Sequence, residues 1–438
     1  MILLYNSNER MTQAPPSPIS SAGPGQQMPN ELLRGWRRVF TALRHRNFRL
    51  FFWGQLISLI GTWMDKTAEG WLVYRLTGSK VLLGVIAAAG TAPMIVFSFW
   101  GGSIADRMPK RSILVVTQAC AMCLAFTEAF LVWSHLVQPW QIVVLATFGG
   151  IIMAFDMPAR QSFVIEMTSR EDLMNAISLN SSVFNGARLI GPSLAGIIMA
   201  RVGIAPCFFI DGLSFMAVIA GLLMMNPPRM KAPARAASAL RHALGGLSYV
   251  RNDRRLFTLF SLFSIVGVFG WSYAVLMPAW ARDVLHVNEA GYGMLMSAGG
   301  LGAMLGALVN AAVGEAMPRR PAVLGGVWLF SAMLLLFAIT RVYALELLFL
   351  AVGSFGMMVF MSTCNTLVQT SVPDEMRGRV MGVWALIFGA MIPIGSLEAG
   401  AMAHWLGTPF TIAFGAIDSA AAAFVTWLSI RNRAATPT

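Results

Sequence analysis

Apolar stretches of about 20 residues, separated by short polar connections, recur along the whole chain. A stretch of that length forms a helix that crosses the hydrocarbon core of a bilayer. Composition agrees, because 56% of the residues are hydrophobic and 12% are charged, whereas about a quarter of the residues in soluble domains are charged. The sequence therefore predicts an all-α polytopic membrane protein embedded in a lipid bilayer. The twelve expected spans are 50–74, 81–103, 112–134, 140–158, 176–200, 204–226, 256–280, 292–314, 321–341, 344–367, 380–403 and 408–430.

The net charge of +12 is distributed in a way that predicts topology. With these spans, 25 Lys and Arg residues lie on the side of the N-terminus and five lie on the other side. Positive loops stay in the cytoplasm, so both termini are predicted to be cytoplasmic and the chain to be multi-pass in the cell inner (plasma) membrane. Because topology accounts for the basic residues, no nucleic-acid partner is expected.

The spans divide the chain into two sets of six. We expect a partly disordered cytoplasmic arm at 1–48, rich in Pro, Ser and Gly at first, and a six-helix bundle at 49–226. A basic cytoplasmic linker at 227–255 then leads to a second six-helix bundle at 256–430 and a tail at 431–438.

The two halves resemble each other in sequence. At a shift of 209 residues, Gly61 matches Gly270, Trp71 matches Trp280 and Gly84 matches Gly293; Met108-Pro-Lys-Arg111 also matches Met317-Pro-Arg-Arg320. Parallel repeats of this kind are typical of secondary transporters, whose substrate site lies between the repeats near the middle of the membrane.

The box Gly102-Ser-Ile-Ala-Asp106-Arg107-Met-Pro-Lys110-Arg111 resembles the cytoplasmic loop motif of the major facilitator superfamily, with Pro109 where that motif has Gly. The stretches 43–55, 154–164, 175–196 and 373–389 resemble the enterobactin-exporter-like branch, which includes multidrug and siderophore efflux proteins. The resemblance covers nearly all of 43–430. It implies two six-helix bundles related by a pseudo-twofold axis.

Three charges interrupt the first span: Asp65, Lys66 and Glu69. Residues three or four apart share a helix face, so Lys66 can pair with Glu69. A carboxylate that exchanges Lys66 for a proton would couple transport to protons. The alternative is a self-neutralised structural cluster near the outer mouth. The repeat favours coupling, because the matching positions are Ala274, Val275 and Pro278 and the fold therefore does not require charges there.

Other polar residues in spans are candidates for the substrate or proton pathway. Arg188 and Asn185 lie on one helical face of the fifth span together with Ser178 and Ser181, and a charge at such depth usually faces a cavity or a partner. The alternative is a hydrogen-bonded seam in which Arg188 pairs with Asp211 or Asp156. Glu398, in a span that also contains Pro393 and Gly395, is expected to line the cavity.

The loop box also predicts a conformational latch at the inner mouth, and the resemblance implies the same role. Asp106 is expected to bind Arg377, Arg379 or the amides that begin the eleventh span, and Arg107 or Arg111 to bind Asp156. The alternative is that the basic residues only anchor the loop on the cytoplasmic side.

The motifs Gly302-x-x-x-Gly306 and Gly378-x-x-x-Gly382 are predicted to be close-packing seams. No catalytic constellation, metal-ligand spacing or phosphate-binding loop is found, so we expect neither enzymatic activity nor a cofactor or metal. Cys120-x-x-Cys123 is expected to be a packing pair.

The sequence thus predicts a secondary active transporter, monomeric and not an enzyme. It would be a proton-coupled exporter of a small organic molecule, drug- or siderophore-like, that works by alternating access. Two alternatives remain open. One is an importer or facilitator of a small metabolite with the same fold, and the other is a non-transporting membrane scaffold or sensor.

Overall fold

The computed structural model describes residues 41–169, 171–225, 239–313 and 317–434, and the helices within these ranges are not accompanied by any strand. The expected arm therefore lies almost entirely outside the described residues, as do half of the linker and the end of the tail. The first half contains η1 (Thr41–Arg44), α2 (Arg46–Thr77), α3 (Lys80–Arg107), α4 (Lys110–Trp133), α5 (Pro139–Met167), α6 (Leu173–Arg201) and α7 (Ala205–Met224).

The second half begins after α8 (Ala239–Asn252), a helix in the linker region that packs on the start of α14. Its first span consists of several short helical segments. Four long helices follow, and α15 is the last element. These elements are α9 (Arg254–Ile265), η2 (Val266–Gly270), η3 (Trp271–Leu276), α10 (Met277–Ala279), η4 (Trp280–Val284), α11 (Glu289–Val313), α12 (Arg319–Ile339), α13 (Tyr343–Ser371), α14 (Asp374–Leu406) and α15 (Thr408–Ala434).

Eleven segments of the described chain are long and apolar enough to cross a membrane, one fewer than expected. The missing one is α2, which has 32 residues and is therefore ~48 Å long. It is long enough to cross a membrane. Its composition is less apolar than that of the eleven, because it contains charged residues such as Asp65, Lys66 and Glu69. We retain α2 as the expected twelfth span because it is packed inside the first half against α6 and α7.

Local sequence explains where the helices stop. Between α2 and α3, Gly78 has φ +61°, a left-handed conformation that glycine adopts without a steric penalty, and this ends α2. The next residue, Ser79, begins α3 by accepting a hydrogen bond from the amide of Leu82 at 3.2 Å. Asp253 caps α9 in the same way. Such short connections keep successive helices antiparallel.

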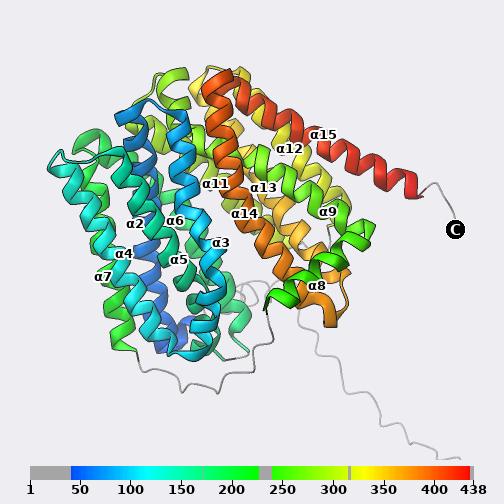
Figure 1. The fold of residues 1–438 in the computed structure, drawn as a ribbon, viewed down its shortest axis with the longest axis horizontal. Helices are drawn as coiled ribbons and strands as arrows, with labels where there is room; N and C mark the ends of the chain where they lie inside the picture. Colours follow the sequence, from blue (N-terminus) through cyan, green and yellow to red (C-terminus); the bar gives the residue numbers. More distant parts are fainter. Residues whose placement is uncertain (1–40, 170, 226–238, 314–316, 435–438) are drawn as a thin grey trace, which may run out of the picture.

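The two halves contact each other through pairs of helices. Helix α3 packs against α14, and α6 packs against α11. Each half therefore contacts the other through its second and fifth spans. In Figure 1 the halves meet at the top and diverge toward the bottom. We call the end where α2 leads into α3, at residues 77–80, the closed end. The end where α2 begins and α3 ends is the open end.

Candidate functional site: a cavity between the halves

The closed end is joined by polar contacts between the halves. Tyr74 on α2 donates a hydrogen bond to the carboxylate of Asp283 on η4, and Arg282 Nη1 donates to the carbonyl of Tyr74 at 3.4 Å. Trp71 Nε1 donates to Glu289 Oε1 at 3.2 Å. Tyr74 and Asp283 are 209 residues apart. They occupy matching positions of the repeat, so they meet where the two repeats face each other.

Glycines allow the halves to approach closely beside these contacts. Gly84 on α3 lies against Ser396 and Gly400 of α14, and Gly293 on α11 lies against Pro192 and Gly196 of α6. A side chain at either glycine would overlap the backbone of the other half. The repeat pair Gly84 and Gly293 is therefore a matched pair of seals on the two sides of the closed end.

The open end lacks such connections. Within the described residues, every hydrogen bond between the two halves involves Trp71 or Tyr74 of α2, and no ion pair joins the halves. At this end, α8 covers the beginning of α14, with Gly246 against the backbone of Arg379. On the other half, His45 bonds Asp172 at 2.8 Å, and this hydrogen bond lowers the pKa of the Asp172 carboxyl.

A cavity of about 520 Å³ lies between the halves, which is within the usual range for sites that bind drug-sized molecules. Its wall from the first half consists of Trp63, Phe184, Arg188 and Pro192. The second half supplies the remaining lining: Phe263, Trp271, Tyr273, Ala274, Met277, Leu295, Met296, Gly299, Leu350, Met358, Met361, Ser362, Asn365, Trp384, Phe388 and Ile392. The cavity is thus apolar and aromatic with a few polar groups.

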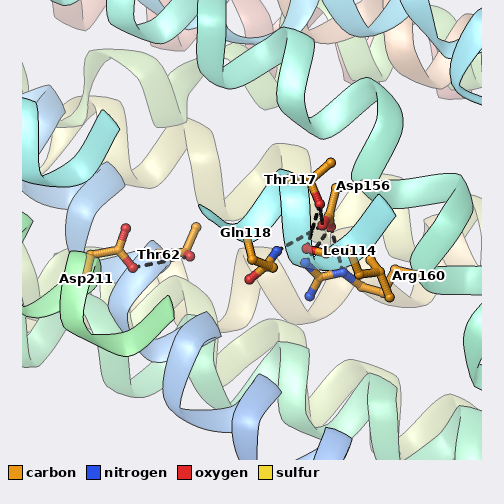
Figure 2. A network of polar contacts seen from close by, with 7 residues as sticks. All are labelled: Thr62, Leu114, Thr117, Gln118, Asp156, Arg160 and Asp211. Atoms are coloured by element: carbon orange, nitrogen blue, oxygen red, sulfur yellow. Dashed lines mark hydrogen bonds and ion pairs between the residues drawn. The ribbon is translucent and has the colours of Figure 1, made fainter. Parts of the chain in front are cut away.

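Arg188 lines this cavity, as expected, and the alternative pairing with Asp211 or Asp156 is not found among the described residues. Its guanidinium lies 5.6 Å from the centre of the Trp63 ring, in a cation–π contact. Figure 2 shows that both acids have other hydrogen-bond partners. Asp211 accepts hydrogen bonds from Thr62 and Ser214, while the partners of Asp156 come from its own half.

Two other expected cavity residues do not line it. Asn185 is buried in α6, and its amide donates to the carbonyl of Ser181 at 2.9 Å. Glu398 is half-buried on α14, and it interacts electrostatically with Asp418 of α15. The reason is helical phase, since the α14 residues that reach the cavity are Trp384, Phe388 and Ile392, spaced by four.

The charges of the first span form a cluster in the first half, in which the two carboxylates are buried and the side chain of Lys66 is 54% exposed. Lys66 Nζ lies 2.6 Å from Glu69 Oε2, as predicted, and 3.8 Å from Asp65 Oδ2. Asp65 and Glu69 are each 6% exposed, and one oxygen of each has no hydrogen-bond donor in the described residues. None of the three residues lines the cavity. The three charges, expected in the substrate or proton pathway of the first span, therefore lie away from the wall of the central cavity.

Two further acids, which are far from the first span in the sequence, also belong to this cluster. Glu128 on α4 and Asp211 on α7 lie close enough to Asp65 for their carboxyl groups to interact with it electrostatically. The cluster therefore has four carboxyl groups and one ammonium group. No spacing in the sequence indicates this, because it depends on how α4 and α7 are rotated toward α2.

Nearly the whole chain matches a known protein family. Residues 38–435 match the model of the family described as transmembrane secretion effector. The chain belongs to this family. It is therefore a transporter of the major facilitator superfamily, with an all-α fold.

The proteins that this chain resembles include transporters of siderophores and drugs. The staphyloferrin A transporter of Staphylococcus aureus is 23% identical, over 85% of this chain and 93% of its own. The multidrug efflux pump Tap of Mycolicibacterium fortuitum is 26% identical, over 82% and 89%. The enterobactin exporter EntS of Citrobacter koseri is 24% identical, over 78% and 81%. These similarities confirm the branch that the motifs indicated.

Solved structures agree on the fold. A bacterial homologue of the human lysosomal transporter Spinster, described as inward-facing and occupied, superimposes with a TM-score of 0.71 at 11% identity. The match covers 88% of this chain and 96% of the other.

The superfamily loop box is not engaged as a latch in this structure. Asp106 and Arg107 are exposed, and neither belongs to an ion pair among the described residues. Asp156 instead binds Arg160 at 2.5 Å and accepts from Thr117 and Gln118 (Figure 2). The pair expected between Asp156 and Arg107 or Arg111 is therefore absent here.

The remaining latch residues are occupied locally. Arg111 donates to the carbonyl of Leu223 at 2.8 Å. Arg377 pairs with Asp374 of its own helix, and Arg379 lies beside α8. With the halves apart at the open end, Asp106 is separated from Arg377 and Arg379 of the second half. Arg111 and Asp156 lie in the same half and are held by their other partners instead.

Proposed function

We propose that this transporter is a proton-coupled exporter of a small organic molecule that works by alternating access. The observation that carries the proposal is the cavity between the halves, bounded by a closed end with glycine seals and an open end without connections. With both termini cytoplasmic, as the distribution of Lys and Arg predicts, the open end faces the cytoplasm. The site is then in position to take up its substrate from inside the cell.

Helix α2 connects the parts that coupling requires. Trp63 lines the cavity, Asp65 and Glu69 belong to the carboxyl cluster, and Trp71 and Tyr74 close the outer end. A change of charge in the cluster therefore acts on the same rigid element that holds the closed end and contacts the substrate.

The carboxyl cluster supports protons as the coupling ion. Burying an unpaired charge away from water costs roughly several kcal/mol of free energy, even after the surrounding protein relaxes. One ammonium, that of Lys66, cannot neutralise four carboxylates. Two carboxyls such as Asp65 and Glu128 form a hydrogen bond only when one of them holds a proton. We propose that this pair carries the transported proton and that Lys66 binds the carboxylates after it leaves.

The latch remains part of the proposal for the other state. When the open end closes, Asp106 would approach the start of α14, with Arg377 and Arg379. Arg107 or Arg111 would reach Asp156 through a rearrangement within the first half, to which all three belong. These pairs would stabilise the outward-open state. In this structure their residues are exposed or bound to neighbours, so they are free to form the pairs when the open end closes.

Transport in everted membrane vesicles tests the proposal. Staphyloferrin A, enterobactin and ethidium are first compared for their retention in cells that lack or overproduce the protein. A compound that is retained less on overproduction is then offered to vesicles with an acidic interior. We expect uptake that stops when a protonophore dissipates the gradient, because efflux in cells corresponds to uptake in everted vesicles.

The double variant Asp65→Asn, Glu128→Gln isolates the coupling step. We expect its uptake to fall to background while it inserts normally in the membrane. Glu375→Gln, an exposed acid at the open end, is the matched control and keeps normal uptake. Uptake that ignores the proton gradient, or a double variant as active as the parent protein, contradicts proton coupling.

A further inference from the structure

The central cavity has a one-sided charge. Among the described residues, Arg188 is the only charged one in the lining, and no acid of the described ranges contributes to the wall. In the described residues Arg188 makes no ion pair, and the ring of Trp63 is its cation–π partner. A guanidinium with five N–H donors in an apolar cavity lacks the acceptors that it would have in water.

Polar groups on the opposite wall add hydrogen-bond donors. Asn365 Oδ1 accepts from Gln369 at 2.7 Å, which leaves the two N–H groups of Asn365 without an acceptor in the described part of the chain. Ser362 Oγ accepts from Asn310 at 2.6 Å, which leaves its own hydroxyl proton to donate. Both residues lie on α13 and line the cavity. The cavity therefore presents donors from two walls and no anionic acceptor.

The rest of the wall selects for flat, apolar groups. Trp63, Trp271 and Trp384 supply aromatic faces, and methionines such as Met296 and Met361 supply flexible, polarisable surface that adapts to different shapes. The buried acids of the first half belong to the carboxyl cluster or, for Asp156, bind Arg160, and none of them is in this lining. An anion in the cavity therefore meets no carboxylate in the wall.

We propose that the cavity binds an anionic aromatic molecule, with the acidic group on Arg188 and the ring against the tryptophans. This inference rests on the proposed transport function and specifies the substrate class of that site. Carboxylate or acidic phenolate groups fit best, because the guanidinium binds planar anions through paired hydrogen bonds. Asn365 and Ser362 then bind further oxygen atoms of the substrate.

Three dansyl compounds with a common ring test the charge preference. Dansylglycine is anionic, dansylamide is neutral and dansylcadaverine is cationic. Binding to the full chain in nanodiscs is measured by energy transfer from the cavity tryptophans, without any ion gradient. We expect dansylglycine to bind at least about tenfold more tightly than dansylamide, the effect of one charge-assisted hydrogen bond, and dansylcadaverine to bind most weakly.

Variants locate the preference at Arg188. We expect Arg188→Gln to lose the advantage of dansylglycine over dansylamide and Arg188→Lys to keep part of it. Arg201→Gln, at the exposed end of the same helix, is the matched control and keeps the full preference. If Arg188→Gln does not fold, Asn365→Asp provides a second test, because a carboxylate in the cavity wall would repel the anion and weaken dansylglycine selectively.

Failure of this inference can be distinguished from failure of the transport proposal. Equal binding of the three compounds, no binding of any, or an anion preference that survives in Arg188→Gln would overturn the anionic class, whatever the vesicles do. An Arg188-dependent preference for dansylglycine upholds the class even if proton-driven uptake is not observed.

Discussion

The outer contact between Tyr74 and Asp283 shows how the repeat produces function at the scale of single residues. The two positions match in sequence and differ in chemistry, one a donor and the other a carboxylate. Two identical residues facing each other across a twofold axis, such as two aspartates, would repel. The divergence of the repeat at this position makes the contact attractive and closes one end.

Tyr74→Phe removes this donor and keeps the ring. A hydrogen bond to a charged group contributes about 1.5–3 kcal/mol, and 1.4 kcal/mol corresponds to roughly a factor of ten. We therefore expect the closed end to open about tenfold more often. The measurement is the rate at which a cysteine at Ala274, in the cavity wall, reacts with a membrane-impermeant maleimide added on the side of the closed end.

Tyr343→Phe is the matched control for that measurement. Tyr343 Oη donates to the carbonyl of Gly291 at 3.0 Å, a bond within the second half only. Its loss should leave the labelling rate unchanged. Equal acceleration in both variants would mean that general loosening, rather than opening between the halves, causes the effect.

Single-residue predictions succeeded where sequence distance decides the contact. Lys66 and Glu69 are three residues apart on one helix, so their pairing could be predicted and is confirmed. Glu128 and Asp211 come from helices whose rotation the sequence does not encode visibly, so their approach to Asp65 could not be predicted. Arg188 was correctly expected to face a cavity or a partner, but which of the two could be decided only from the structure.

At the scale of helices, the first span of the second half departs most from expectation. The sequence predicts one continuous helix over 256–280, whereas the structure has π-helical turns at η2 and η4 and a 3₁₀ segment at η3. Trp271, Tyr273 and Ala274 of η3 line the cavity. Irregular turns often mark functional segments. They arise from tertiary packing, which apolar periodicity does not report.

Glycine motifs were predictable only in part for the same reason. Gly302 and Gly306 pack against the backbone of α13, as predicted. A side chain at Gly378 or Gly382 would meet nothing within 4 Å, so the second seam is wrong for this structure. A spacing of four places two glycines on one face but does not specify which helix that face meets.

The glycine seals give a prediction for helix packing. Gly293→Leu would place a side chain against Pro192 and Gly196 on α6. Overpacking costs typically about 1–3 kcal/mol, so the closed end should be disfavoured by roughly tenfold or more. We expect the closed end to be open in most molecules and uptake in everted vesicles to fall sharply.

Gly149→Leu on α5 is the control, because nothing lies within 4 Å of a side chain built there. It makes the same substitution at a position away from the seals, and uptake should be normal. Normal uptake in Gly293→Leu would show that the closed end does not need to close this tightly during the cycle.

For the whole molecule, the all-α fold and the superfamily were readable from the sequence, because span length and the loop box are local patterns. The state of the molecule was not readable. Which end is closed depends on the balance between contacts such as Tyr74–Asp283 and the unformed latch at Asp106. The same sequence is expected to satisfy either set of contacts in turn, and this is the basis of alternating access.

Distances between spin labels at the two ends test this account most directly. One pair of labels is placed at Met108 and Glu375 across the open end, and the other at Arg75 and Asn288 across the closed end. The exposed Cys120 and Cys123 are first replaced by serine. Distances are recorded by pulsed electron paramagnetic resonance in nanodiscs, in acidic and in alkaline buffer.

The account predicts reciprocal changes. In acidic buffer, where the Asp65–Glu128 pair holds its proton, the closed-end distance should be short and the open-end distance long. In alkaline buffer the open-end distance should shorten while the closed-end distance lengthens, and Asp65→Asn with Glu128→Gln should abolish the dependence on pH. Distances at both ends that stay fixed, or that lengthen together, would contradict it.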